Sequence, residues 1–335
     1  MSTDSGELDV DGGANPEAGT PAANAKWRKW HTRRRNVVIT GISGRLGTLL
    51  ARRLHRDAHV IGLDRRPIDV LPRDIEFHQV DLRRRKAEDL FRRNRIDALV
   101  HLNIMHDPRR STEEHHNFNI VGTQKMLDLC QQHGVGKVVV LSSANVYGPS
   151  PTNTQFMTEE APLMGGTHFE AIRDLIAVDM ACSSYFWRHP EIETVILRPS
   201  HIIGCVNNAP SNYLRLDPVP TLLGFDPMVQ LIHVEDVISA IMLSLRPGVR
   251  GVYNLSGPPA VPLSEIVARM GKQTRPLPEP LVRPFFKFLF RTRLTSFPTA
   301  EFDYIKFVCM VDDARARQHL GYAHQHDLDA ILAAL

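Results

Sequence analysis

Short apolar stretches alternate with amphipathic ones along most of the chain. The apolar stretches are rich in valine, isoleucine and leucine and are bounded by polar residues or glycine, a pattern that is typical of strands buried on both faces. They lie at residues 37–40, 59–63, 75–80, 97–102, 137–143 and 193–199. The stretches between them predict helices at 45–56, 85–94, 112–133 and 169–187. This alternation predicts an α/β fold with a doubly wound, largely parallel sheet and helices on both of its faces.

The alternation weakens after about residue 200, where proline and glycine become frequent. We therefore assign residues 36–200 to the sheet domain and residues 201–335 mainly to a smaller C-terminal lobe, with some segments returning to the sheet. Residues 1–25 contain five acidic residues and no basic ones. Their composition predicts a disordered tail, which together with a basic lead-in makes up residues 1–35.

Two basic segments lie outside the strand and helix pattern. Residues 26–35, KWRKWHTRRR, hold six lysine or arginine residues and two tryptophans. They suit either a contact with an anionic surface or a solvated lead-in, and we favour the lead-in. Residues 281–294 suit either a helix on an anionic membrane or a lid that packs its aromatic face on its own domain, and we favour packing. A net charge of +3 at pH 7 is too small to indicate a nucleic-acid partner.

The four cysteines lie far apart, and no two of them have the spacing of a zinc knuckle or a redox dithiol. The sequence therefore predicts no metal site. It contains no run of about 18 apolar residues, and its acidic first residues lack the basic-then-apolar order of a signal peptide. We expect a cytoplasmic protein.

A glycine-rich stretch follows the first predicted strand. Residues 37–47, VVITGISGRLG, place Gly41, Gly44 and Gly47 three apart between a strand and a helix. A tight turn and a close backbone approach leave no room for a Cβ there, and a helix N-terminus offers its amides to a pyrophosphate. The stretch predicts a Rossmann-type dinucleotide site. The predicted cofactor contacts of the loop are Gly41, Ile42, Ser43, Gly44, Arg45, Leu46 and Gly47.

The residues after the next two strands predict the adenosine end of this site. Asp64 ends the second strand, where a carboxylate accepts both ribose hydroxyls of NAD and repels a 2′-phosphate. Arg65 and Arg66 follow, and either of them could contact a 2′-phosphate or stack on the adenine. NAD is therefore the predicted cofactor, with NADP as an alternative. Asp81 and Leu82, at the end of the third strand, are expected to lie beside the adenine.

Nine motifs stand along the chain between Thr40 and Gly257. They read TGISGRLG (40–47), GLD (62–64), VDL (80–82), VHLN (100–103), NIVGTQKMLDLC (119–130), GVGKVVVLSSANVYG (134–148), ILRPS (196–200), HVEDVISAI (233–241) and VYNLSG (252–257). Together they resemble the extended short-chain dehydrogenase/reductase superfamily, specifically its NAD-dependent epimerase/dehydratase group, which acts on nucleotide sugars. The resemblance implies a Rossmann domain with a smaller substrate lobe, a small-molecule substrate, and a homodimer formed through the helices at 112–133 and 169–187.

The resemblance also implies roles for individual residues. Asn119 would support the backbone of the active site, and Ser143 would hydrogen-bond the reacting oxygen of the substrate. Leu102 and Asn103 would contact the cofactor, and Asn103 stands where most family members have alanine. His101 is expected to be a strand-end residue beside the cofactor rather than a catalytic base.

The catalytic pair of the family is absent from this chain. In the family a tyrosine transfers the hydroxyl proton during hydride transfer, and a lysine four residues later favours the phenolate. Counting from EEAPL (159–163), Phe169 stands at the tyrosine position and Arg173 at the lysine position. None of the six tyrosines is followed four residues later by lysine, so no register restores the pair.

Ser143, Tyr147 and His168 are the candidate replacements. Imidazole has a suitable pKa for acid/base work, although His168 equally fits an exposed helix-start residue, and Tyr147 belongs to a motif that is common for structural reasons. Arg173 would keep the positive charge and donate to a ribose hydroxyl of the cofactor. Two functions are open. We favour an NAD-dependent oxidoreductase or epimerase-like enzyme with a modified proton-transfer site, and the alternative is a catalytically inactive NAD(P)-binding sensor or scaffold.

Overall fold

The structure is a computed structural model. It describes residues 34–68, 70–104, 112–167, 170–204, 209–280, 284, 303, 306, 307 and 309–335. The predicted acidic tail lies outside these residues, as do most of the basic segments 26–35 and 281–294. No helix within the described residues is both long and apolar enough to cross a membrane.

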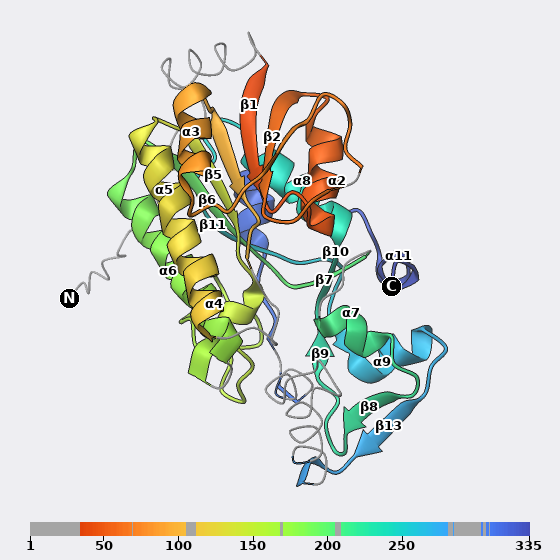
Figure 1. The fold of residues 1–335 in the computed structure, drawn as a ribbon. Helices are drawn as coiled ribbons and strands as arrows, with labels where there is room; N and C mark the ends of the chain where they lie inside the picture. The colour runs from red at the N-terminus through yellow and green to blue at the C-terminus, as the bar shows by residue number, and fades with distance from the viewer. Residues whose placement is uncertain are drawn as a thin grey trace, which may run out of the picture. The chain divides into compact units, whose positions relative to one another are not determined.

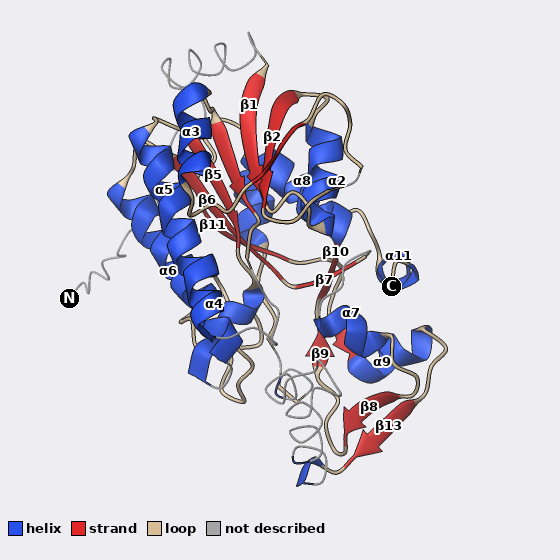
Figure 2. Ribbon diagram, in the orientation of Figure 1, coloured by secondary structure: helices blue, strands red, loops and turns tan. Residues whose placement is uncertain are grey.

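A parallel sheet forms the centre of the described chain (Figures 1 and 2). Its strands are β1 (Arg35–Thr40), β2 (Ala58–Asp64), β3 (Glu76–Gln79), β4 (Ala98–His101), β5 (Lys137–Leu141), β6 (Glu193–Pro199) and β11 (Gly251–Leu255). They run in the order β11-β6-β5-β4-β1-β2-β3, and every neighbouring pair is parallel. The order reverses between β1 and β4, where open α/β sheets bind their ligands.

Helices cover both faces of this sheet because most of its strands, unlike the edge strand β3, are apolar on both sides. Val37 and Ile39 of β1 pack in one core, and Val38, between them, packs in another. The helices are α2 (Arg45–Leu54), α3 (Arg85–Arg93), α5 (Gly122–Gln132), α6 (Glu170–Arg188) and α8 (Val234–Ser244). Residues from α2 and α8 complete the first core, and residues from α3, α5 and α6 complete the second. The two groups of helices lie on opposite sides of the sheet (Figure 1). The predicted α/β doubly wound fold is confirmed.

The predicted helix at 112–133 contains a π-helical turn in the structure. It consists of α4 (Thr112–His116), one π-helical turn η1 (Asn117–Val121) and α5. π-helical turns of this kind occur frequently at functional sites. The predicted helix is therefore present over 112–132. The π-helical turn within it was not predicted, because apolar periodicity does not distinguish a single wider turn from an α-helical one.

After β6 the described chain consists mainly of short elements. They are β7 (His201–Ile203), α7 (Ala209–Leu214), β8 (Val219–Leu222), β9 (Met228–Val229), β10 (Leu231–His233), β12 (Val261–Pro262), α9 (Leu263–Arg269), β13 (Thr274–Leu277) and α11 (Leu328–Ala333). The turn η5 (Ala316–Leu320) instead packs on the first core of the main sheet. A separate apolar core includes Ile203, Leu214, Ile266 and Ile331. The chain returns to the main sheet through α8 and β11, and the boundary at residue 200 stays a prediction.

Candidate functional site

The loop between β1 and α2 lies at the point where the strand order reverses. Gly41 has a φ of 76°, and a Cβ on it would lie 3.0 Å from the carbonyl carbon of Leu102 and 3.1 Å from the backbone of Asn103. A Cβ on Gly47 would lie 2.4 Å from the carbonyl oxygen of Gly41. Glycine is therefore required at both positions by the surrounding backbone. The structure brings this loop together with the residues that follow β4.

The remaining residues of the loop divide between the core and the start of α2. Ile42 is fully buried, and its side chain packs under Gly62 of β2. Gly44 is the N-cap residue of α2 and has no side chain that could bond the first amides of the helix. Arg45 is exposed, and Leu46 packs partly on the core. Because the first-turn amides of a helix have no partner within the helix, this end can receive an anionic group.

The carboxylate of Asp64, at the end of β2, is held by two neighbouring loops. Its Oδ1 accepts the Arg66 N–H at 2.9 Å, and its Oδ2 accepts the Ser43 N–H at 3.1 Å. The guanidinium of Arg66 lies 3.4 Å from both oxygens, through Nε and Nη2. The Arg65 side chain instead lies over Phe118, with Cζ 4.6 Å from the ring centroid. Asp64 thus lies beside the glycine loop, with its charge balanced by Arg66.

Asp81 and Leu82 follow β3, the next strand of the sheet. Asp81 accepts the Arg83 N–H at 3.0 Å, and its Oδ2 lies 2.6 Å from Nη2 of the same arginine. These hydrogen bonds from Arg83 lower the pKa of Asp81. Leu82 is buried in the core that α3 covers. An adenine contact by Asp81 would therefore compete with its bonds to Arg83.

His101, at the end of β4, is a buried link between elements. Its Nδ1 lies 2.7 Å from Thr40 Oγ1, and its Nε2 lies 2.9 Å from Thr123 Oγ1. Thr123 in turn donates to the carbonyl oxygen of Asn119 at 2.5 Å. Burial lowers the pKa of His101 to about 4, so the imidazole is neutral at pH 7. These contacts fit a strand-end residue rather than a base.

Ser143 lies in a tight turn after β5. It caps the 3₁₀ turn η2 (Ala144–Val146), and its Oγ accepts the Asn145 N–H at 3.2 Å. The backbone at Gly165 packs closely on this turn. A Cβ on Gly165 would lie only 2.3 Å from the carbonyl oxygen of Asn145. Arg173, exposed on α6, donates from Nε to the carbonyl oxygen of Gly166 at 3.0 Å. The structure therefore brings the Ser143 turn and the start of α6 together.

Two of the residues predicted for the catalytic site, the candidate base and the residue at the tyrosine position, are not described by the structure. His168 and Phe169 lie outside the described residues. Their proposed roles rest on the sequence, which puts them immediately before α6. Within the part of the chain that is described, no group of three or more histidine, cysteine or carboxylate side chains could hold a metal ion.

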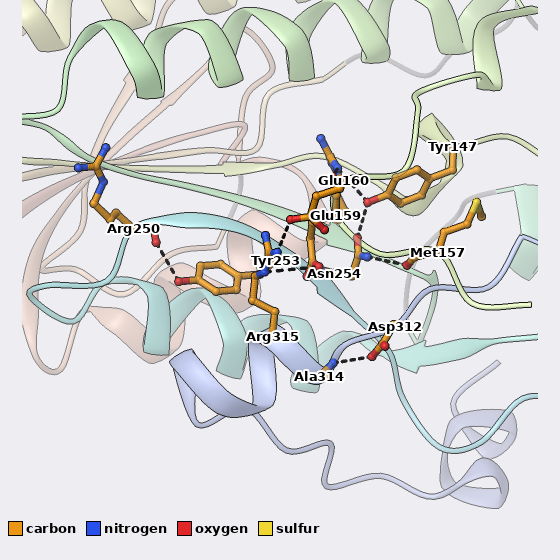
Figure 3. Close-up of polar contacts among 11 residues, drawn as sticks. Tyr147, Met157, Glu159, Glu160, Arg250, Tyr253, Asn254, Asp312, Ala314 and Arg315 are labelled. Carbon is orange, nitrogen blue, oxygen red and sulfur yellow. Dashed lines mark hydrogen bonds and ion pairs between the residues drawn. The ribbon is translucent and has the colours of Figure 1, made fainter. Parts of the chain in front are cut away.

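Tyr147 is part of a buried polar network (Figure 3). Its hydroxyl donates to Asn254 Oδ1 at 2.8 Å and accepts from Arg198 Nη1 at 2.8 Å. Arg198 forms an ion pair with Asp179 of α6, which also accepts from Ser142 Oγ at 2.6 Å. Burial raises the pKa of Tyr147 to about 12. Because the hydroxyl is engaged on both sides inside the fold, the geometry argues against Tyr147 as a proton carrier.

Glu159 extends this network to the C-terminal part of the chain (Figure 3). The N–H of Asn254 donates to its Oε1 at 2.8 Å, and Arg315 Nε lies 3.7 Å from its Oε2. Burial raises the pKa of Glu159. Met157 pairs with Val311 as an isolated bridge nearby. The sequence carried no signal for these contacts, because each joins residues that are far apart in the chain.

The sequence of this chain matches a known protein family. The model of the NAD dependent epimerase/dehydratase family matches residues 37–256. The chain belongs to this family. Over 297 residues it is 27% identical to the uncharacterized protein Rv0501 of Mycobacterium tuberculosis. This alignment covers 85% of this chain and 79% of that protein. Over 166 residues it is 33% identical to UDP-glucose 4-epimerase 2 of Oryza sativa. This second alignment covers 48% of this chain and 39% of the relative.

Several solved structures have the same fold as this chain. MoeE5 in complex with UDP-glucuronic acid and NAD has a TM-score of 0.69 at 22% identity, with 89% of this chain and 97% of that chain covered. The UDP-Glc/GlcNAc 4-epimerase of Campylobacter jejuni has a TM-score of 0.69 at 18% identity, with 90% and 97% covered. At these identities the similarity shows the fold, and it confirms the predicted Rossmann architecture. The predicted family is likewise confirmed by the match over residues 37–256.

Proposed function

We propose that the protein binds NAD and acts as an oxidoreductase or epimerase-like enzyme on a hydroxyl or carbonyl group of a nucleotide sugar or a related small molecule. The observation that carries this proposal is the backbone packing of Gly41 and Gly47 at the carboxyl end of β1. The residues present fit a dinucleotide, because a tight loop, a helix N-terminus and the carboxylate of Asp64 lie together there. Relatives named as UDP-glucose 4-epimerases and neighbours solved with UDP-sugars and NAD support the class of substrate.

The proposal extends to the residues around the substrate, whose roles are those that the family resemblance implies. A bound nicotinamide would supply the hydride chemistry. Ser143, in the turn after β5, would hydrogen-bond the reacting oxygen through its hydroxyl. Arg173, exposed at the start of α6, would hold a ribose hydroxyl and keep the positive charge that lysine supplies in the family.

We assign proton transfer to His168. Tyr147, the other candidate, has its hydroxyl bound by Arg198 and Asn254, and it remains a neutral phenol far above pH 7. His168 immediately precedes Phe169, which stands at the family's tyrosine position and cannot carry a proton. An imidazole can take up and release a proton near neutral pH.

The test uses purified protein with NAD and a panel of UDP-sugars. Turnover would be followed by the absorbance of reduced nicotinamide and by chromatography of the sugars, since an epimerase regenerates its cofactor. His168→Ala should lower turnover by about 100-fold or more, the usual effect of removing a general acid or base. His133→Ala, at the exposed end of α5, is the matched control. Full activity of His168→Ala would remove this residue from the mechanism.

The alternative function is that of a catalytically inactive NAD(P)-binding sensor or scaffold. The observation that favours it is the absence of both members of the tyrosine and lysine pair in every register. Tight NAD binding without turnover across the substrate panel would support this alternative. Any turnover that depends on the cofactor would exclude it.

We further propose a homodimer that packs α5 and α6 against the same helices of a second copy. Large apolar side chains are exposed at this surface: Met180 is 59% and Trp187 78% accessible on α6, and Val121 is 40% accessible just before α5. Exposed apolar side chains that gather on one surface commonly mark a protein interface. The family resemblance points to the same helices.

A further inference from the structure

The carboxylate that should select NAD already has hydrogen-bond partners within the chain. Asp64 is 1% exposed, and its two oxygens accept from the amides of Ser43 and Arg66. The guanidinium of Arg66 adds contacts at 3.4 Å to both oxygens. A neighbouring cation weakens the repulsion between a carboxylate and a 2′-phosphate, and here the Arg66 guanidinium is that cation.

The same arginine is accessible from the side of the glycine loop. Its side chain is 59% exposed. Its Nη2 lies 3.6 Å from the position that a Cβ on Gly44 would occupy, and the Ser43 hydroxyl donates to its carbonyl oxygen at 2.9 Å. The loop, Asp64 and Arg66 thus form one hydrogen-bonded unit. Its outward charge is that of an arginine, which binds phosphate with several donors at once.

We propose that the adenosine end of this site accepts the 2′-phosphate of NADP, and that Arg66 is the residue that admits it. This inference rests on the proposed function, because it concerns the same dinucleotide site. Arg66 would donate to the 2′-phosphate while it stays beside Asp64, so that the carboxylate orients the guanidinium rather than the ribose. The protein therefore takes NADP as well as NAD, in contrast to the cofactor that the family name indicates.

Arg65 provides the matched control because it carries the same charge one residue away. Its guanidinium lies over the ring of Phe118, and its carbonyl oxygen accepts from the side chain of Gln79 at 3.0 Å. It is therefore directed away from Asp64. Removing Arg65 changes the net charge of the site as much as removing Arg66 does, but it leaves the contacts to Asp64 in place.

The experiment measures equilibrium binding by calorimetry, with 2′,5′-ADP and 5′-AMP as probes of the adenosine end and with NADP and NAD as whole cofactors. Wild-type protein should bind 2′,5′-ADP at least as tightly as 5′-AMP. Arg66→Ala should weaken 2′,5′-ADP by about tenfold or more, as expected for a lost charge-assisted contact, and change 5′-AMP by less than about threefold. Arg66→Lys should retain part of the preference, and Arg65→Ala should affect the two nucleotides equally.

The outcomes separate this inference from the proposed function. Binding of NAD and 5′-AMP without binding of NADP and 2′,5′-ADP would overturn the inference and leave the proposed function in place. An unchanged ratio in Arg66→Ala, or a selective loss in Arg65→Ala, would also overturn it. Failure of wild-type protein to bind either dinucleotide would overturn both proposals.

Discussion

Arg198 of β6 and Asp179 of α6 form a buried, two-pronged ion pair, with 2.6 Å between Nη2 and Oδ1 and 2.9 Å between Nε and Oδ2. Their side chains are only 4% and 0% exposed. The pair also holds Ser142 through Asp179 and Tyr147 through Arg198. It therefore connects the end of β5, next to Ser143, with the helix on which the family's catalytic lysine position lies.

The effects of substituting Arg198 and Asp179 on the free energy of unfolding should depend strongly on each other. Arg198→Met or Asp179→Leu alone should lower the free energy of unfolding by about 3–5 kcal/mol, because each leaves one buried charge without its partner. The double variant should be more stable than the sum of the two single losses predicts. Urea denaturation of the four proteins would measure this. Additive losses would show that the two side chains do not act as a pair.

A second prediction separates Tyr147 from catalysis. Tyr147→Phe should lower the free energy of unfolding by about 1–3 kcal/mol, because Asn254 Oδ1 and Arg198 Nη1 both lose a buried partner. Turnover should fall by less than about threefold, whereas His168→Ala should lose about 100-fold. Thermal unfolding and turnover would be measured on the same preparations. A stable Tyr147→Phe protein without activity would contradict the assignment of proton transfer.

Backbone packing predicts the effect of adding a methyl group to the glycine loop. Gly47→Ala would place a Cβ 2.4 Å from the Gly41 carbonyl oxygen, so the loop must shift. We expect NAD affinity to fall by about tenfold or more, since the loop geometry presents the helix amides to the pyrophosphate. Gly122→Ala on α5 is the control, because its Cβ would meet nothing within 4 Å. Equal NAD affinity in both variants would show that the loop does not bind the cofactor.

The buried His101 predicts a loss of stability in mild acid. Its pKa is about 4 in the folded protein, where burial lowers it, against about 6.5 in an unfolded chain. Between these values the unfolded chain binds a proton that the folded protein does not, so stability is full above about pH 6.5 and falls as the pH falls toward 4. At pH 5 the proton that His101 binds in the unfolded chain lowers the free energy of unfolding by about 2 kcal/mol.

The His101 contribution is measured by urea unfolding at pH 7 and pH 5. His101→Gln should be less stable at pH 7, because the links to Thr40 and Thr123 change, and its stability should depend less on pH. His133→Gln, at the exposed end of α5, should keep the wild-type pH dependence. The same pH dependence in all three proteins would rule out His101 as its source.

The exposed apolar residues of α6 predict the oligomeric state. Trp187→Glu or Met180→Glu should shift the protein from dimer to monomer in light scattering after size-exclusion chromatography, because a charge would be buried at the interface. Leu223→Glu, at a residue that is 62% exposed in the C-terminal lobe, is the control and should remain dimeric. A wild-type monomer at high concentration would contradict the proposed dimer.

Much of the fold could be predicted because its signals are local. Six of the strands in the main sheet were expected within one or two residues, since continuous β-branched stretches at 37–40 and 193–199 mark strands buried on both faces. The π-helical turn at Asn117–Val121 and the place of β11 beside β6 were not predicted. Both depend on how the helix or strand meets its neighbours, and apolar periodicity does not record this.

The sequence by itself determined the family, the glycine loop and the absence of the tyrosine and lysine pair, because each is a matter of spacing between near neighbours. The tertiary structure decided which polar groups are already engaged. Tyr147 meets Arg198 and Asn254 only when β5, β6 and β11 lie side by side. Ser43 reaches the Asp64 carboxylate only when β1 and β2 pair. Hydrogen bonds and ion pairs between distant residues depend on packing that no single stretch of sequence encodes.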